Sequence, residues 1–477
     1  MYASKSEKTT KEDKKQAVLF DEIEKTLVKH EKASTIKVKS HRRKKVSRKP
    51  IPKDISRKEI LLDLSDEEKT CECGCQRAFI KDEISEKIDI IPEQVFVRRY
   101  TRKLYACKKC EGTANENKPA VRSKPIPENI IPQSQVSAGL IAHIVTRKFE
   151  YALLFYRQEK LFNRLGIDIS RVKMCQWSMN VAQKLEALVK LIEREICKSP
   201  TIGIDETRVQ VMKEPGKRNQ ENSYMWVFLS PTEKLVTYNY SQSRGATTPI
   251  NFLGNFKGNI MTNDFSGYSP VSKLDGIQHS LCWAHTKRYF HKAAKESSLD
   301  SESNWYLRKI NQLYRVERII REKNMNDDET VALRQRLSKP IMNEIKMAFE
   351  KHLINVQPES LIGKAIKYLD KSFKKFTNYL SDGTIPIDNN MTENAIRPFV
   401  IGRKNWLFSG SPRGAKASAT FYSIIESAKM NGFDPYWYLR LLLAKVCHKL
   451  DEKKLFDLLP NQVTVEQIEE FKKGVLA

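Results

Sequence analysis

The sequence predicts a multidomain α+β protein, and three observations support this class. Its 477 residues are enough for two to four domains with a large core. Short β-like runs separated by turns fill residues 201–284, whereas residues 286–380 have the long, charged pattern of helices. A cysteine-rich unit comes earlier in the chain. We therefore expect a small module, a helical region, and a sheet that is interrupted by a helical block and rejoined by a helix.

The charge balance indicates an anionic partner. The chain has 84 Lys and Arg against 58 Asp and Glu, a net charge of +26, and 40% of its residues are apolar, as in globular proteins. The first 60 residues hold 19 of the basic and 9 of the acidic residues, so the excess is not confined to a tail. Such an excess favours a nucleic-acid partner over a charge that only maintains solubility.

The sequence contains no recognisable targeting signal. No run of about 18 apolar residues predicts a membrane span, and the N-terminus, MYASKSEKTTKEDKKQ, lacks the apolar core of a secretory signal. Nine cysteines in a long chain, five of them clustered, fit a reducing compartment with a metal site better than a disulfide scaffold. We expect a cytoplasmic, nucleoid-associated protein with no membrane partner.

Residues 1–65 are charged and poor in aromatic residues. Within them, IKVKSHRRKKVSRKPIPK (36–53) predicts a flexible basic linker that lies on phosphates, or a linker that is only solvated.

Residues 66–115 form a cysteine-rich module. Cys107 and Cys110 have the Cys-x-x-Cys spacing of half a tetrahedral zinc site, whereas the other half is the irregular CECGC. The predicted zinc ligands are four of the five residues Cys71, Cys73, Cys75, Cys107 and Cys110, with reduced structural cysteines as the alternative. Between the two halves, DIIPEQVFVRRYTRKLYAC alternates as a β-hairpin does. Its basic residues Arg98, Arg99, Arg102 and Lys103 are candidate DNA contacts.

Residues 130–198 have a helical pattern that breaks at Gly166 and resumes after a predicted N-cap at Ser170. A helix, a short turn with glycine and a second capped helix outline a helix-turn-helix, which binds DNA. Two ordinary packed helices give the same pattern.

Three carboxylates are placed for chemistry. Asp205 lies in the probable strand TIGIDETRVQV, and Asp264 ends the run IMTNDFSGY before the turn at Gly267. A carboxylate inside a strand is costly unless it is paired or binds a metal. Glu393 begins a helix further along, and the three together would supply oxygen ligands for two Mg²⁺ ions, with Mn²⁺ as a substitute. Taken singly, each acid also fits a turn or a helix-dipole role.

The stretch PIDNNMTENAIRP (386–398) would set the direction of Glu393. Asp388, Asn389 or Asn390 is suited to cap the helix, assisted by Thr392, and the cap determines where the helix starts. Arg397 follows one turn later and is a candidate phosphate contact.

Two further segments carry candidate DNA contacts. In HSLCWAHTKRYFHK (279–292), we expect His285 to contact the scissile phosphate or a flipped base, and Lys287 and Arg288 to contact the backbone. Cys282 and Trp283 are expected to pack in the core, with a Cys-x-x-His metal site as the weaker alternative. In GRKNW, Arg403 and Lys404 are candidate phosphate contacts and Trp406 a core residue. We interpret the scattered cysteines as packing residues: Cys175, Cys197 and Cys447.

These segments together resemble a known family. In chain order they are GIDET, NDFSGY, CWAHTKRYF, PIDNNMTENAIRP and GRKNWLFSGSPRGA. They are similar to transposases of the insertion sequence 66 family, which resemble other DDE transposases. The resemblance implies a ribonuclease H-like catalytic domain in residues 199–285 and 381–414, an α-helical insertion in 286–380 and a helical region in 415–477. It maps the catalytic triad to Asp205, Asp264 and Glu393, and it implies a zinc-finger-like N-terminal module.

The resemblance also implies an activity. Such a transposase binds terminal inverted repeats, cleaves phosphodiester bonds to expose a 3′-OH and joins that end to target DNA. Synapsis of two ends implies a homo-oligomer, and small accessory proteins of the element are possible partners. Family members begin with a longer coiled-coil segment, so this chain is expected to start inside it. The alternatives are a truncated, catalytically idle DNA-binding protein and a ribonuclease H-like nuclease that only hydrolyses.

Overall fold

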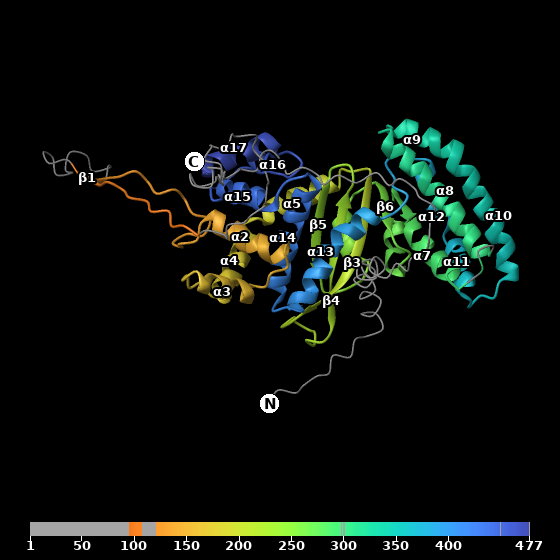
Figure 1. Ribbon diagram of the computed structural model, residues 1–477, viewed down its shortest axis with the longest axis horizontal. Coiled ribbons are helices and arrows are strands. Elements are labelled where there is room, and N and C mark those ends of the chain that lie inside the picture. Colours follow the sequence, from red (N-terminus) through yellow and green to blue (C-terminus); the bar gives the residue numbers. More distant parts are fainter. Residues whose placement is uncertain (1–94, 107–120, 297, 299–300, 449, 477) are drawn as a thin grey trace, which may run out of the picture. The chain divides into compact units, whose positions relative to one another are not determined.

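The computed structural model describes residues 95–106, 121–296, 298, 301–448 and 450–476 (Figure 1). The chain divides into two compact units, 1–92 and 93–477, and the described residues all belong to the second unit. The predicted basic linker and all five candidate zinc ligands, Cys71, Cys73, Cys75, Cys107 and Cys110, lie outside them.

The second unit opens with a strand pair and four helices. Strand β1 (Tyr105–Ala106) pairs antiparallel with β2 (Val121–Arg122), so the pairing partner of β1 follows the predicted hairpin instead of lying inside it. The helices are α2 (Ala138–Phe149), α3 (Phe155–Arg164), α4 (Arg171–Lys184) and α5 (Glu186–Ile196).

The predicted break between α3 and α4 is confirmed. Gly166 has a φ of +74°, a left-handed conformation that glycine adopts without strain. The Ser170 side chain accepts a hydrogen bond from the backbone N–H of Lys173 and so caps α4. Both helices pack on α2 through a small cluster that includes Phe162 and Met174.

A mixed six-stranded sheet forms the centre of the unit. Its strands are β3 (Thr201–Val211), β4 (Asn222–Ser230), β5 (Leu235–Ser241), β6 (Gly258–Thr262), β7 (Ile277–Leu281) and β8 (Phe408–Ser409). The order is β5-β4-β3-β6-β7, and β8 pairs with the far end of β3. Neighbouring strands among β3, β4 and β5 run antiparallel to each other, whereas β6 and β7 run parallel to β3. Between β5 and β7 lie α6 (Thr247–Leu253) and two 3₁₀ turns, η1 (Ser266–Tyr268) and η2 (Val271–Lys273).

Helices cover both outer edges of this sheet. On β5, Ser427 of α14 (Pro412–Met430) accepts from the backbone N–H of Val236 and donates to its carbonyl, and Ser423 accepts from the N–H of Tyr238. On β7, Asn378 donates to the carbonyl of His279. The free backbone groups of an edge strand attract other chains, and these side chains satisfy them.

An all-helical insertion separates β7 from the helix that returns to the sheet. It comprises α7 (Trp283–Ala294), α8 (Glu302–Glu322), α9 (Asp327–Leu333), the π-helical η3 (Arg334–Ser338), α10 (Lys339–Asn355), α11 (Leu361–Asp370), α12 (Phe373–Thr377) and η4 (Asn378–Leu380). Most of these helices share a hydrophobic core, which also includes Met261 of β6 and Leu281 of β7. Arg334 of η3 is buried, and its guanidinium binds both carboxylate oxygens of Glu317 at 2.9 and 2.7 Å.

The chain then returns through α13 (Asn390–Trp406), which packs on β3 and β4. It ends with α14, α15 (Pro435–Val446), α16 (Glu452–Phe456) and α17 (Val465–Leu476). None of the helices in the described residues is both long and apolar enough to cross a membrane.

The start of α13 lies unusually close to β3. A Cβ atom on Gly203 would lie 2.1 Å from Oγ1 of Thr392 and 2.8 Å from Oδ1 of Asn389. Asn389 occupies the N-cap position, but its side chain does not cap the helix. It instead donates to the carbonyl of Ile204 at 3.0 Å. The capping role predicted for Asn389 is therefore replaced by a tertiary contact that fixes α13 to the strand, while Oδ1 of Asp388 accepts from the backbone N–H of Asn390, the first residue of the helix, at 3.1 Å.

Replacing Gly203 with Ala is expected to destabilise the protein by about 1–3 kcal/mol, because Thr392 is buried and its β-branched side chain has few alternative rotamers. Urea denaturation measures the change. Gly410→Ala is the matched control, since nothing lies within 4 Å of a Cβ atom at that position. Equal stability of the two variants would contradict the close packing of α13 on β3.

Candidate active site

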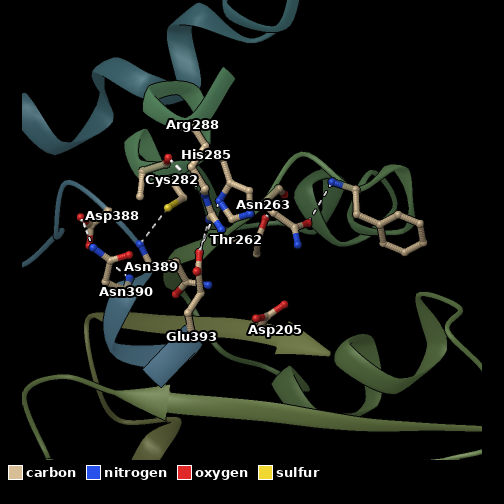
Figure 2. Close-up of polar contacts among 12 residues, drawn as sticks. Asp205, Thr262, Asn263, Cys282, His285, Arg288, Asp388, Asn389, Asn390 and Glu393 are labelled. Atoms are coloured by element: carbon tan, nitrogen blue, oxygen red, sulfur yellow. Dashed lines mark hydrogen bonds and ion pairs between the residues drawn. The ribbon is translucent and has the colours of Figure 1, made fainter. Parts of the chain in front are cut away.

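Side chains from β3, α7 and α13 converge beside the sheet. Figure 2 shows Glu393 of α13 between His285 of α7 and Asp205 of β3. Gly203 faces α13, and Asp205 is two residues further along the same strand, so its side chain points to the same face. The absence of a side chain at Gly203 thus lets Glu393 approach Asp205.

Asp205 is a partly buried carboxylate in an unfavourable electrostatic setting. Its Oδ1 accepts one hydrogen bond from the backbone N–H of Glu206 at 2.9 Å. Burial, together with the charges of Glu206 and Glu393, raises the pKa of Asp205 to about 8, although the backbone N–H of Glu206 and the charge of Arg288 act in the opposite direction. The ionised form of Asp205 is therefore disfavoured here unless a cation compensates its charge.

Glu393 stands in the first turn of α13, where the helix dipole favours a carboxylate. Its Oε1 receives a charge-assisted hydrogen bond from Arg288 at 2.8 Å and lies 3.5 Å from Nδ1 of His285. The glutamate side chain is 22% exposed and that of Arg288 is 58% exposed. The pair therefore sits at the solvent-facing side of the site, within reach of a large substrate.

Cys282 and His285 lie next to Glu393. Burial raises the pKa of the Cys282 thiol to about 12, against the opposing effect of the backbone N–H groups of Asn389 and His285. Burial, together with Arg288, lowers the pKa of His285 to about 4, so its imidazole is neutral at pH 7. Cys282 is fully buried, as predicted for a core residue. However, a sulfur, a nitrogen and an oxygen atom of Cys282, His285 and Glu393 lie within 4.8 Å of one another.

Asp264 faces the helical insertion. Its Oδ2 accepts a hydrogen bond from Lys371, at the end of α11, at 3.0 Å, and its side chain is 13% exposed. The strand register identifies the preceding residue, Asn263, as a further candidate for the site. Gly203 lies beside Met261, so continuing this parallel register by two residues brings Asn263 level with Asp205. Asn263 was not a candidate at the sequence level, because an amide beside an aspartate reads as part of the turn.

The sheet carries a second buried cluster on its opposite face. Glu206 has a side chain only 1% exposed, receives two hydrogen bonds from Arg244 at 2.8 and 2.6 Å, and accepts a third from the hydroxyl of Tyr268. Arg244 also stacks on Phe265, 3.7 Å from the ring centroid. Glu206 thus has an ion-pair partner and a hydroxyl donor, which Asp205 beside it does not have among the described residues. Its partner is remote in sequence, and no local signal identifies it.

The predicted DNA-contacting residues have different environments. Those on the extended segment before and beside β1 are all exposed: Arg98, Arg99, Arg102 and Lys103. On α13, Arg397 and Lys404 are exposed, whereas Arg403 is partly buried and donates to Oγ1 of Thr207 at 3.2 Å and to the carbonyl of Arg208. The ammonium of Lys287 lies 4.9 Å from the ring centroid of Tyr314. Arg403 therefore fastens α13 to β3, and Trp406 packs against Phe399 beneath it.

This fold and its carboxylate site lie within a region shared with known transposases. The family model described as Transposase IS66 family matches residues 133–417, more than half of the chain and all of the site. The chain belongs to this IS66 transposase family. The zinc-finger binding domain of transposase IS66 matches residues 68–111, which supports a structural zinc ion there, and the IS66 C-terminal element matches residues 423–461.

Three uncharacterised proteins of Sinorhizobium fredii (strain NBRC 101917 / NGR234) are similar to this chain. Protein y4jD is 29% identical over 411 residues, which cover 83% of this chain and 78% of its own. Protein y4qI is 27% identical over 405 residues, covering 81% and 72%, and y4hP is 25% identical over 453 residues, covering 90% and 79%. Their names assign no activity, so they carry no functional argument.

Asp205→Asn is expected to stabilise the metal-free protein. The pKa of Asp205 is about 8 in the folded chain against an ordinary 3.8, so only the folded chain keeps this proton between those values. Stability must then fall as pH rises from about 4 to about 8. Asparagine removes this loss. In EDTA at pH 8 we expect the free energy of unfolding of the variant to exceed that of the parent chain by about 1–3 kcal/mol, and we expect this difference to shrink toward pH 5.

Chemical denaturation at the two pH values measures this gain. Asp275→Asn serves as the control, because the Asp275 side chain is 96% exposed. A gain that is equal at both pH values, or equal in the control, would contradict the unfavourable setting of Asp205.

Proposed function

We propose that this chain is a divalent-cation-dependent DNA transposase of the DDE type. The observation that carries the proposal is the meeting of Asp205 and Glu393, which a whole helical insertion separates in sequence. The sheet, with three antiparallel strands followed by two parallel ones, supports a ribonuclease H-like catalytic domain. Such a domain would comprise residues 199–285 and 381–414.

The residues present fit Mg²⁺ or Mn²⁺. Both ions prefer carboxylate and amide oxygens, and Asp205, Glu393 and the end of β6 supply them. The uncompensated charge around Asp205 is what a bound cation would relieve. When bound, such cations stabilise the charge on the attacking and leaving oxygens of a phosphoryl transfer.

The other side chains of the site would orient the DNA. Arg288 is exposed beside Glu393 and presents a guanidinium fork suited to a phosphate. His285, neutral at pH 7, can hydrogen-bond a phosphate or a base without adding charge. Asp205 and Glu393 stand on a strand and a helix that pack tightly together, so their separation is fixed before the substrate binds.

The third oxygen ligand for the cation would come from the end of β6. Asp264 is the carboxylate of this segment, and we retain it as the third member of the triad. To join the site it must exchange its contact with Lys371 for the cation. Asn263, level with Asp205, would add an amide oxygen at the same strand end.

The proposed reaction is that of a transposase. Water attacks the phosphodiester at the element end and releases a 3′-OH, and this hydroxyl then attacks a phosphodiester of the target DNA, with no covalent protein–DNA intermediate. Terminal inverted repeats would be bound by the zinc module, the basic segment from Arg98 to Lys103 and the exposed first turn of α4. Synapsis of two ends requires a homo-oligomer, and accessory proteins of the element are further candidate partners.

Asp205→Asn, Asp264→Asn and Glu393→Gln are each expected to lower cleavage by at least about 10³-fold, because each removes a charged donor to the reacting centre. The assay incubates the purified chain with a labelled duplex bearing the terminal inverted repeat and a target plasmid, in Mg²⁺ and in EDTA. Mg²⁺-dependent joining to the plasmid is the expected result.

Asn263→Ala completes this series. If it abolishes cleavage while Asp264→Asn does not, the donor from β6 is Asn263 and the assignment of Asp264 is wrong. Nicks without joined product would indicate a hydrolysis-only nuclease. Binding without cleavage, in Mg²⁺ and in Mn²⁺, would indicate a catalytically idle DNA-binding protein.

A second prediction concerns DNA affinity. Replacing Arg98, Arg99, Arg102 and Lys103 together by Ala should reduce the slope of log Kd against log salt by about 3–4, because each phosphate contact contributes about 0.9 to this slope. Fluorescence anisotropy on a labelled duplex measures it. The control removes the same charge from α16 and α17, through Lys453, Lys454, Lys472 and Lys473. An equal change in both variants would show that the first segment is not a DNA contact.

A further inference from the structure

The helical insertion leaves and re-enters the sheet at one place, and its two ends are already joined there. The backbone N–H of Trp283, at the start of α7, donates to the carbonyl of Ile387 at 3.2 Å. The N–H of Asn389 donates to Sγ of Cys282 at 3.2 Å. Arg288 and Glu393 then form the ion pair described above. Three contacts thus link the first turns of α7 to the entry of α13.

The same place holds three metal-ligand atoms of mixed chemistry. Cys282 is the N-cap residue of α7 and His285 lies in its first turn, so the Cys-x-x-His spacing directs a thiol and an imidazole to one side. Glu393 approaches them from α13 (Figure 2). Nδ1 of His285 is buried and has no hydrogen-bond partner, although Oε1 of Glu393 lies 3.5 Å away. A buried nitrogen without a hydrogen bond is costly, and here it faces a carboxylate and a thiol, so a bound metal ion would satisfy it.

We propose that Cys282, His285 and Glu393 form a second metal site, which binds Zn²⁺ or a similar borderline divalent ion and fastens the two ends of the helical insertion together. A thiolate, an imidazole and a carboxylate are the ligand types that this class of ion prefers over Mg²⁺. The site differs from the proposed oxygen-ligand site in the type of its ligands, and Glu393 is the one residue that the two proposals have in common.

The geometry requires little rearrangement. Ligand atoms about 2.0–2.3 Å from a tetrahedral ion lie within about 4 Å of one another. The three ligand atoms in this chain lie within 4.8 Å of one another. Side-chain rotations that shift these atoms by about 1 Å would bring them to the spacing of a tetrahedral site. On binding, the Cys282 thiol releases its proton to solvent. The N–H of Asn389 and the N-terminal end of α7 then stabilise the thiolate.

Three protein ligands leave a fourth position open. Glu393 has two oxygens, and in this arrangement one would face the borderline ion while the other remains available toward Asp205. Binding would also draw Glu393 from Arg288 and free that guanidinium. Metal binding at this site does not depend on DNA cleavage, so it can be tested separately from the proposed function.

Cobalt titration of the full, reduced and metal-free chain tests the proposal. Cobalt bound to a thiolate gives a near-ultraviolet charge-transfer band, and tetrahedral cobalt gives strong visible bands. The predicted zinc module also binds cobalt, so variants are compared with the parent chain. We expect Cys282→Ser to take up about one cobalt ion fewer per chain, and His285→Ala to weaken this binding by at least about tenfold.

Matched controls are available in the same chain. Cys175→Ser, exposed on α4, and His291→Ala, exposed two turns further along α7, should leave the titration unchanged. Asp205→Asn should lose cleavage and keep the cobalt spectrum, so failure of the proposed function would not be mistaken for failure of this site. Because Cys282 is buried, circular dichroism is used to check that the Cys282→Ser variant folds. If it does not fold, the titration of His285→Ala decides the test.

Two results would overturn the proposal. One is a cobalt titration of His285→Ala that is superimposable on that of the parent chain. The other is an equal loss of cobalt in Cys175→Ser, which would mean that the difference is not specific to this cluster. Either outcome would leave Cys282, His285 and Glu393 as a hydrogen-bonded packing cluster.

Discussion

The close contact between α13 and β3 is the constraint on which the rest of this structure depends. Only a residue without a side chain at position 203 leaves room for Thr392 and Asn389 against the strand. That contact places the first turn of α13 over β3 and so carries Glu393 to Asp205. It also closes the insertion, because α13 is the segment that brings the chain back to the sheet. One steric condition thus determines both the site and the place where the chain returns from the helical insertion to the sheet.

The electrostatics of β3 follow from the alternation of its side chains. Asp205 and Glu206 are consecutive, so they face opposite sides of the sheet. Glu206 is paired with Arg244 and hydrogen-bonded by Tyr268, whereas Asp205 has a second carboxylate nearby and only a weaker opposing effect from Arg288. The fold therefore neutralises one acid and leaves its neighbour under-compensated. The unfavourable setting of Asp205 lowers the stability of the folded chain. Such a cost is typical of side chains that bind a ligand or take part in catalysis.

Local sequence signals identified the elements better than the contacts between them. The break at Gly166, the cap at Ser170 and the burial of Cys282 follow from short-range chemistry and were predictable. Asn389 was not, because a capping residue and a residue that binds a neighbouring strand have the same local sequence. The edge-covering serines of α14 and the Glu206–Arg244 pair were missed for the same reason, since their partners are remote. Asn263 became a candidate only through the strand register.

The helical insertion is part of the site, not an appendage to it. Three acids at this end of the sheet have a partner on it: Lys371 binds Asp264, Arg288 binds Glu393, and Tyr314 donates to Asp388 at 2.8 Å. These partners are cations or hydroxyl groups at the end of α11, on α7 and on α8. A shift of those helices would therefore change the charge balance of all three acids together. The core of the insertion includes Met261 of β6 and Leu281 of β7, so these polar contacts belong to the same packing that joins the insertion to the sheet.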